Sequence, residues 1–262
     1  MGEDAKGGLY ESAWHGDRPY DEKEAIRLEK ASRLVRREAE RLRLSRRYDL
    51  LDAGCGVGPL RRWLPAEAFR IVGLELSPEA ARIARGGYDS CEVADVEQPW
   101  PVERASFDGV HAGAVLEHVV DWHAPLNHAN RALRDGGLLV VSVPNLRYWK
   151  EIRRLLRGRQ PHWMCEMTHL HAYTPRFLRE LVSLHGFRVI GMEADRVNLP
   201  LLPSRGEWVC RALAGLGSVL ILSARLQRRV RVEDRARAGR FPGHKQVGLR
   251  SIAVPLGDEH PS

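Results

Sequence analysis

A glycine-rich turn follows a strongly apolar segment at Tyr48–Gly58. The run Tyr-Asp-Leu-Leu-Asp-Ala-Gly-Cys-Gly-Val-Gly predicts a buried strand that enters a tight turn and then a helix. Gly54, Gly56 and Gly58 carry no β-carbon, so a ligand can approach the backbone, and Pro59 suits the first turn of the helix. Since the amides at a helix N-terminus attract anions, the pattern is typical of a nucleotide-cofactor site.

Asp52 distinguishes this turn from a dinucleotide-binding fingerprint. It lies two positions before the first glycine, and Pro59 stands where the third glycine of G-x-G-x-x-G is expected. A carboxylate at this place would repel a pyrophosphate. It suits a ligand that carries an ammonium beside a carboxylate, such as the amino-acid end of S-adenosylmethionine.

Further strands follow at regular spacing. Arg70–Glu75 is a short apolar strand that ends in an acid about 20 residues past the first glycine, the spacing that brings a carboxylate to ribose hydroxyls. Ser90–Val96 predicts a third strand with Asp95 near its end, and Ser106–His118 predicts a fourth strand that runs into a loop. In a parallel sheet these strand ends line one edge.

With these motifs, Tyr48–Gly191 resembles the class I S-adenosylmethionine-dependent methyltransferases, specifically the small-molecule group whose first motif reads Leu-Asp-x-Gly-Cys-Gly-x-Gly. The resemblance implies an α/β, Rossmann-like fold: a seven-stranded, mostly parallel sheet with helices on both faces and an antiparallel last strand. It also implies S-adenosyl-L-methionine as the cofactor.

The resemblance assigns roles to particular residues. Asp52 would contact the methionine ammonium, Glu75 the ribose hydroxyls and Asp95 the adenine amino group. Leu76 would pack on the base, and the Val96 amide would face its ring. The complete expected cofactor-binding set is Asp52, Gly54, Gly56, Glu75, Leu76, Asp95, Val96 and Gly113.

Composition and charge limit the class of protein. The chain has 262 residues, 44% apolar content and a net charge of +7, which raises nucleic acid as a partner. The arginines of residues 33–47 alternate with glutamates, as on a solvated helix face, so nucleic acid is not the favoured partner. The four cysteines lie far apart without a C-x-x-C pair, and neither a signal peptide nor a membrane span is indicated, so we expect a cytoplasmic protein.

The chain divides into a core and two additions. Residues 1–46 are expected to be an N-terminal extension with a lid helix, and 47–198 with 247–256 the methyltransferase core. Within this core, apolar and polar residues alternate at Val247–Val254, which predicts the seventh strand. Residues 199–246 are expected to be a helical insert that covers the substrate. Its stretch 208–231, apolar and then arginine-rich, leaves contact with lipid or an acyl-bearing acceptor as an alternative.

Three histidines are candidates for acid–base chemistry. Methyl transfer to a hydroxyl requires positioning and a base, and His118 follows Glu117 where the family places active-site groups. His169 and His171 lie just past the fifth strand and would point the same way in an extended loop. Ubiquinone-type O-methyltransferases also resemble this stretch, and their metal-binding Glu is replaced here by Ala114, so no metal is expected.

The sequence therefore predicts transfer of a methyl group from S-adenosylmethionine to a small-molecule acceptor, most simply a hydroxyl oxygen. Two alternatives stay open. Residues 144–174 resemble a methionine-biosynthesis family with a methyltransferase-like fold, which implies a regulatory or activating partner in amino-acid metabolism. Methylation of RNA is the other. Neither the acceptor nor the oligomeric state follows from the sequence.

Overall fold

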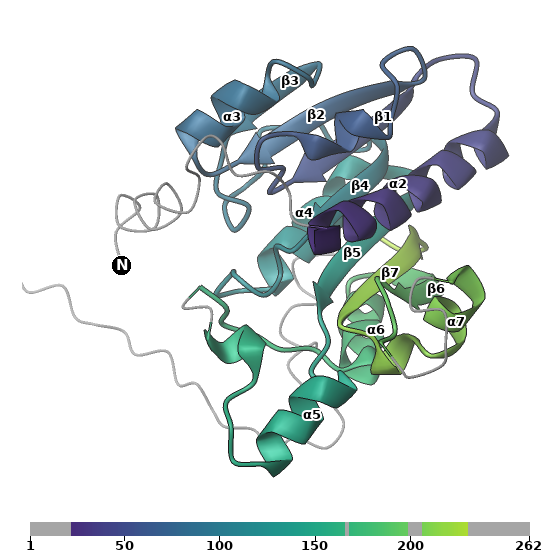
Figure 1. Ribbon diagram of the computed structural model, residues 1–262. Helices are drawn as coiled ribbons and strands as arrows, with labels where there is room; N and C mark the ends of the chain where they lie inside the picture. The colour runs from purple at the N-terminus through teal and green to yellow at the C-terminus, as the bar shows by residue number, and fades with distance from the viewer. Residues whose placement is uncertain (1–21, 166–167, 199–205, 230–262) are drawn as a thin grey trace, which may run out of the picture. The chain divides into compact units, whose positions relative to one another are not determined.

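A seven-stranded sheet organises residues 22–165, 168–198 and 206–229, the part of the chain that the computed structural model describes (Figure 1). The strand order is β3-β2-β1-β4-β5-β7-β6. Strands β1 to β5 pair in parallel, and β7 runs antiparallel to both β5 and β6. The strands are β1 Tyr48–Ala53, β2 Phe69–Glu75, β3 Ser90–Val93, β4 Phe107–Gly113, β5 Leu133–Pro144, β6 Phe187–Ala194 and β7 Val219–Leu226. The predicted Rossmann-like fold is confirmed.

Helices precede and connect these strands. Those in the described residues are α2 Glu22–Leu42, α3 Pro78–Ala84, α4 His123–Ala132, α5 Trp149–Leu156, α6 Pro175–Leu184 and α7 Glu207–Ala212, with short 3-10 helices η1 Pro59–Arg62, η2 His162–Cys165 and η3 Ala214–Leu216. Two of them start with side-chain caps that the sequence indicates. Ser77 accepts a hydrogen bond from the Ala80 amide at α3, and Thr174 accepts one from Phe177 at α6.

Helix α2 is part of the core. Its residues Leu28, Ala31 and Val35 are buried in one cluster with Leu50 of β1 and Val140 of β5. Burying this apolar stripe stabilises the helix far more than its intrinsic propensity does. The helix expected within the N-terminal extension therefore packs on the sheet, as Figure 1 also shows.

Polar contacts fasten α2 to the last strands. Nη2 of Arg33 donates to both carboxylate oxygens of Glu193 on β6, at 2.9 and 2.8 Å. Nη2 of Arg225 on β7 donates to Glu38 at 2.6 Å. The part of the 1–46 extension that precedes α2 lies outside the described residues, and its role as a lid remains a proposal.

The expected position of the seventh strand is wrong. The strand that completes the sheet is β7, Val219–Leu226, inside the 199–246 segment that was expected to be a helical insert. Because β7 lies between β5 and β6 and is almost entirely buried, its sequence is nearly continuous in apolar residues, and periodicity does not separate such a run from a buried helix. The alternating segment Val247–Val254 lies outside the described residues.

The remaining described part of the expected insert packs beside β6. Val209 and Cys210 of α7 are buried in a small cluster with Ala194 and Val197. Deleting residues 199–246 would remove β7 from the sheet, so such a deletion would not test a substrate lid. The lid role remains a proposal for the α7 region alone.

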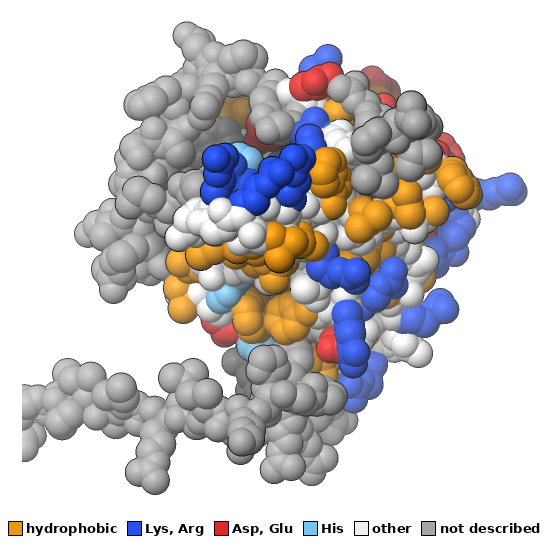
Figure 2. Space-filling view, turned by 60° about the horizontal axis from the view of Figure 1, so that its bottom comes forward, with side chains coloured by type: hydrophobic (Ala, Val, Ile, Leu, Met, Phe, Trp, Pro, Cys, Tyr) orange, Lys and Arg blue, Asp and Glu red, His pale blue; other side chains and the backbone are white. Residues whose placement is uncertain are grey.

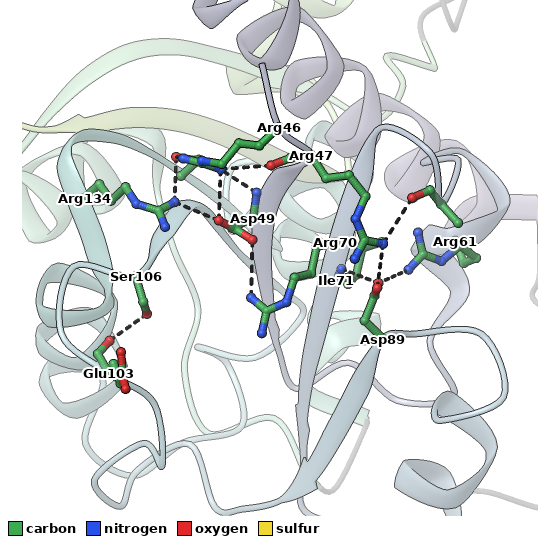
Figure 3. A network of polar contacts seen from close by, with 12 residues as sticks. Arg46, Arg47, Asp49, Arg61, Arg70, Ile71, Asp89, Glu103, Ser106 and Arg134 are labelled. Atoms are coloured by element: carbon green, nitrogen blue, oxygen red, sulfur yellow. Dashed lines mark hydrogen bonds and ion pairs between the residues drawn. The ribbon is translucent and has the colours of Figure 1, made fainter. Parts of the chain in front are cut away.

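A network of ion pairs lies at the amino ends of the strands (Figure 3). Arg46 donates to both carboxylate oxygens of Asp108, at 2.6 and 2.8 Å, and Arg134 donates to the same carboxylate at 2.8 Å. Asp49 accepts from Arg46, Arg134 and Arg70 at 2.9, 3.0 and 3.3 Å. These arginines account for part of the positive charge, and each forms an ion pair with Asp49 or Asp108.

Replacing Asp108 by Asn should lower the free energy of unfolding by about 2 kcal/mol, measured by urea denaturation at neutral pH. Asp108 accepts from Arg46, from Arg134 and from the Asp49 amide, and a single amide oxygen cannot serve all these donors. The figure is below that for a fully buried pair because Arg46 and Arg134 are partly exposed and therefore screened.

The effect should depend on pH. Burial works to raise the pKa of Asp108, but hydrogen bonds from Arg46, the Asp49 amide and Arg134 outweigh it, and the pKa lies below its usual range. The stability that Asp108 contributes is present above about pH 4 and is lost as pH falls through the folded-state pKa, so the two proteins should converge in acid. As a control, Arg82→Gln at an exposed surface pair should leave the midpoint unchanged. Equal stability of wild type and Asp108→Asn at pH 7 would contradict the prediction.

Candidate active site

The backbone of the turn after β1 favours glycine at three positions. Gly54, Gly56 and Gly58 all have positive φ, at 68°, 55° and 77°, a conformation that side chains disfavour. A β-carbon on Gly54 would lie 2.5 Å from Cγ2 of Val115, and one on Gly58 would lie 3.2 Å from Cα of Ala84. The sequence interpretation explained these glycines by ligand approach alone. The structure adds that Gly54 lets the loop after β4 lie directly on the turn.

Glu75 connects the end of β2 to this turn. The carboxylate is buried, and it accepts from the Gly56 amide at 2.8 Å and from the Ser77 amide at 2.9 Å. Burial raises the pKa of Glu75, and the two backbone amides act in the opposite direction. The predicted acid thus lies at the carboxyl edge of the sheet beside the glycine turn. Its contact with a ribose stays a prediction.

Asp52 lies beneath the turn and is only 2% exposed. One carboxylate oxygen accepts from the Tyr88 hydroxyl at 2.6 Å and the other from Nδ1 of His111 at 2.7 Å. Burial, followed by the nearby Asp52 carboxylate, raises the pKa of Tyr88, so the phenol stays protonated and donates. Sequence reasoning missed both partners, although a histidine inside the apolar β4 run was a signal. The predicted contact of Asp52 with an ammonium is untested.

The residues expected at the adenine end lie after β2 and β3. Leu76, Asp95 and Val96 are each half-buried. Asp95 accepts from the Glu97 amide at 2.9 Å and so closes the turn after β3, and the Val96 carbonyl accepts from Nε1 of Trp100 at 3.0 Å. The Val96 amide and the Leu76 side chain are therefore held on ordered segments at the same sheet edge. Their contacts with a base remain predictions.

Gly113 ends β4 beside two buried polar atoms. A β-carbon at this position would lie 2.5 Å from Nε2 of His111 and 3.2 Å from Oγ of Ser142. Both atoms are buried, and neither has a hydrogen-bond partner in the described part of the chain. Because buried polar atoms normally have a partner, this place is suited to a water molecule or a polar ligand atom. Because Gly113 has no β-carbon, Nε2 of His111 and Oγ of Ser142 stay accessible to such an atom.

The turn after β4 brings together residues that are distant in sequence. The backbone carbonyl of Glu117 accepts from the Leu170 and His171 amides at 2.7 and 3.2 Å, which fixes the loop after η2 against this turn. The rings of His118 and His169 consequently lie 4.7 Å apart. These two candidates, which 50 residues separate along the chain, form one pair.

Hydrogen bonds define the tautomers of the two rings. Nδ1 of His118 lies 3.1 Å from the Thr168 carbonyl, and Nδ1 of His169 lies 2.9 Å from the Trp163 carbonyl. Since a carbonyl only accepts, each Nδ1 carries a hydrogen. Burial, followed by the neighbouring His169, lowers the pKa of His118 to about 4. His118 is therefore neutral at pH 7, with Nε2 as its basic atom.

The same group offers ligands for a cation. One donor atom from each of Glu117, His118 and His169 lies within 4.8 Å of the others. A carboxylate with two imidazoles is a donor set for a first-row divalent metal. The sequence interpretation expected no metal because Ala114 replaces a carboxylate, but it did not foresee a donor from the later loop. The expectation of no metal stays a prediction.

His171 belongs to a different cluster. Its ring lies 4.3 Å from that of Trp122, which also packs against Tyr173 and Phe177. His169 thus pairs with His118, whereas His171 packs on Trp122. The expectation that His169 and His171 point the same way in an extended loop stays a prediction. His171 contributes to an aromatic wall beside the His118–His169 pair.

Known proteins are similar to this chain in sequence. The methyltransferase domain family matches residues 23–191. The ubiquinone biosynthesis O-methyltransferase of Bradyrhizobium sp. (strain ORS 278) is 34% identical over 149 residues, which are 53% of this chain and 57% of that protein. The protein of the same name from Rhodopseudomonas palustris (strain HaA2) is 30% identical over 188 residues, 68% of this chain and 72% of that protein. The chain thus spans little more than half of the first of these relatives.

A solved structure shows the same fold. The 1,6-didemethyltoxoflavin-N1-methyltransferase of Burkholderia thailandensis superposes with a TM-score of 0.56 at 18% identity, covering 86% of this chain and 88% of that one. The family match covers more than half of the chain, and the sheet order and the glycine turn agree with it. The chain belongs to the methyltransferase domain family, whose cofactor is S-adenosyl-L-methionine.

Proposed function

We propose that this protein transfers the methyl group of S-adenosylmethionine to an oxygen atom of a small molecule, at the carboxyl edge of β1, β2 and β4. One observation carries the proposal. The loop that bears Glu117 and His118 packs on the glycine turn through Val115 and Gly54, so the candidate base His118 would lie beside the expected cofactor bed. The choice of oxygen is supported by the two relatives, which are ubiquinone biosynthesis O-methyltransferases.

The residues at this edge fit the cofactor. The left-handed glycines form the turn beside which the methionine part would lie, and Glu75 at the end of β2 would bind the ribose. When bound, the cofactor supplies a methyl group on a positively charged sulfur. Asp52 stabilises the turn from below through Tyr88 and His111, and its charge favours a ligand ammonium nearby.

His118 is suited to take the acceptor's proton. Nε2 of His118 carries the lone pair, and the Thr168 carbonyl holds the ring in that tautomer. A hydroxyl group within hydrogen-bond reach would lose its proton to this atom while its oxygen bonds the methyl carbon. His169 is placed to share that hydrogen-bonding role, and the aromatic wall of Trp122 and His171 would bound an apolar part of the acceptor.

Glu75→Ala should weaken binding of S-adenosylhomocysteine by about 30-fold in titration calorimetry. The lost interactions of a buried carboxylate with two hydroxyls are worth about 2 kcal/mol, and each 1.4 kcal/mol is tenfold in affinity. Glu79→Ala, which removes an exposed acid on α3, is the matched control and should bind like wild type. Unchanged affinity in folded Glu75→Ala would remove Glu75 from the cofactor site.

His118→Ala should reduce kcat by about 100-fold or more and leave the Kd for S-adenosylmethionine within about twofold. His128→Ala on α4, whose ring packs on Trp100, is the control and should keep the wild-type rate. If His118, His169 and His171 can each be replaced without loss of turnover, a histidine base is ruled out.

Dialysis against EDTA tests whether Glu117, His118 and His169 instead hold a metal ion. Loss of activity that a divalent cation restores would identify this cluster as a metal site.

The pH profile of kcat/KM gives an independent check. Since the pKa of His118 is lowered to about 4, its neutral form persists well below pH 6, and activity should stay level between pH 8 and about pH 5 before it falls. A histidine with the ordinary pKa near 6.5 would lose more than about 90% of the rate by pH 5. A fall centred near pH 6.5 would exclude His118 as the base in the uncomplexed enzyme.

A further inference from the structure

The amphipathic helix α5 is oriented with its apolar side toward solvent. Ile152, Leu155 and Leu156 lie on one face at i, i+3 and i+4 spacing, and they are 39%, 49% and 84% exposed. The side of the helix that packs on the protein carries Glu151, which is buried and accepts from the His162 amide at 2.8 Å and from Nδ1 of His162 at 3.0 Å. A helix normally buries its apolar face, so this inverted arrangement indicates a partner.

The exposed apolar residues are concentrated in this part of the fold. Among the described residues, ten large hydrophobic side chains are exposed, and five of them lie between residues 152 and 170; besides the three on α5 they are Met164 and Leu170. Helix α5 lies at the bottom of Figure 1, and Figure 2, which brings the bottom forward, shows hydrophobic side chains with Lys and Arg side chains next to them.

The surroundings of α5 are strongly basic. Residues 145–165 contain six Lys or Arg and a single acid, the buried Glu151. Five of the basic side chains are exposed, and none of these five forms an ion pair with any residue in the described part of the chain; they are Arg147, Lys150, Arg153, Arg157 and Arg159. This contrasts with the amino edge of the sheet, where Arg46 and Arg134 are bound to carboxylates.

We propose that the surface formed by residues 147–165, the α5 surface, docks onto an anionic lipid bilayer. Exposed Ile and Leu flanked by Lys and Arg are the pattern of a helix that lies in the membrane interface, with its apolar face among acyl chains and its cations at the phosphates. A second copy of this chain is disfavoured because a two-fold interface would bring the same cations together. RNA would not use the apolar face. In the described residues no helix has the length and apolar character required to cross a bilayer, so the contact is peripheral.

Docking would place the active-site edge next to the membrane. The loop that continues from the α5 surface donates the Leu170 amide to Glu117 at 2.7 Å, and the Thr168 carbonyl accepts from His118. An acceptor dissolved in the bilayer would thus meet the His118 region without passing through water; this consequence, unlike the docking, rests on the proposed function. The docking differs from the contact through 208–231 considered from the sequence. Its stretch Val219–Leu226 is the largely buried strand β7, and in its described part Trp208 is the exposed large apolar residue.

Co-sedimentation of the full chain with vesicles tests the docking without any turnover. Wild type should bind vesicles of equal parts phosphatidylglycerol and phosphatidylcholine, bind phosphatidylcholine alone at least tenfold more weakly, and lose binding with added salt. The double variant Leu155→Ser with Leu156→Ser, and the double variant Arg153→Glu with Arg157→Glu, should each weaken binding at least tenfold. Trp208→Ser and Arg176→Glu, both at exposed positions elsewhere, should bind like wild type.

The other outcomes of the binding assay overturn the docking proposal. Failure of wild type to bind, or equal binding of the α5 variants, removes the α5 surface as the docking site, and loss of binding in Trp208→Ser moves it to α7. Sedimentation equilibrium identifies self-association: a dimer that Leu155→Ser with Leu156→Ser dissociates, without vesicle binding, shows that a second copy covers the face. Unchanged thermal midpoints confirm that the variants are folded. Vesicle binding together with failure of the Glu75 and His118 predictions would leave the docking in place and remove the proposed function.

Discussion

The close approach of Val115 to Gly54 sets the geometry of the whole candidate site. A β-carbon at Gly54 would overlap the Val115 side chain, and the left-handed backbone at Gly54 also disfavours one. The chain continues from Val115 into Glu117 and His118, and the carbonyl of Glu117 in turn holds the loop that carries His169. A larger residue at position 54 would move these groups outward together, because packed interiors transmit displacement. The separation between cofactor bed and base therefore depends on one absent methyl group.

Much of the sheet could be predicted because its pattern is local. The parallel strands are apolar runs, two of which end in Glu75 and Gly113, and helices α3 and α6 carry Ser77 and Thr174 as caps before a proline. The seventh strand could not be placed in this way. A strand covered on both faces has no alternation, and the lateral position of β7 between β5 and β6 results from long-range pairing that no window of sequence contains. The alternating pattern at Val247–Val254 was the more visible signal.

In the candidate site, too, local features could be predicted and long-range contacts could not. Glycine spacing and the acid at the end of β2 predicted where Gly54, Gly56 and Glu75 would meet. The partners of Asp52, Tyr88 and His111, were not predicted, since they approach it from α3's end and from a neighbouring strand. The pairing of His118 with His169 depends on how a loop folds back after η2, and residue type alone did not separate His169 from His171. The sequence predicted residues that lie in local motifs, and it did not predict contacts between segments that are distant along the chain.

The position of β7 late in the sequence affects how the chain folds during its synthesis on the ribosome. Among the strands that the structure describes, β6 pairs only with β7 and is synthesised before it. Until Val219–Leu226 has emerged, β6 cannot join the strands already made, and α2 lacks the bond between Glu38 and Arg225 that spans 187 residues. The contact between α2, the first described helix, and β7, the last described strand, therefore forms late, together with the pairing of β6 and β7. A nascent chain halted before β7 exposes the apolar edge of β5, which is a target for chaperones.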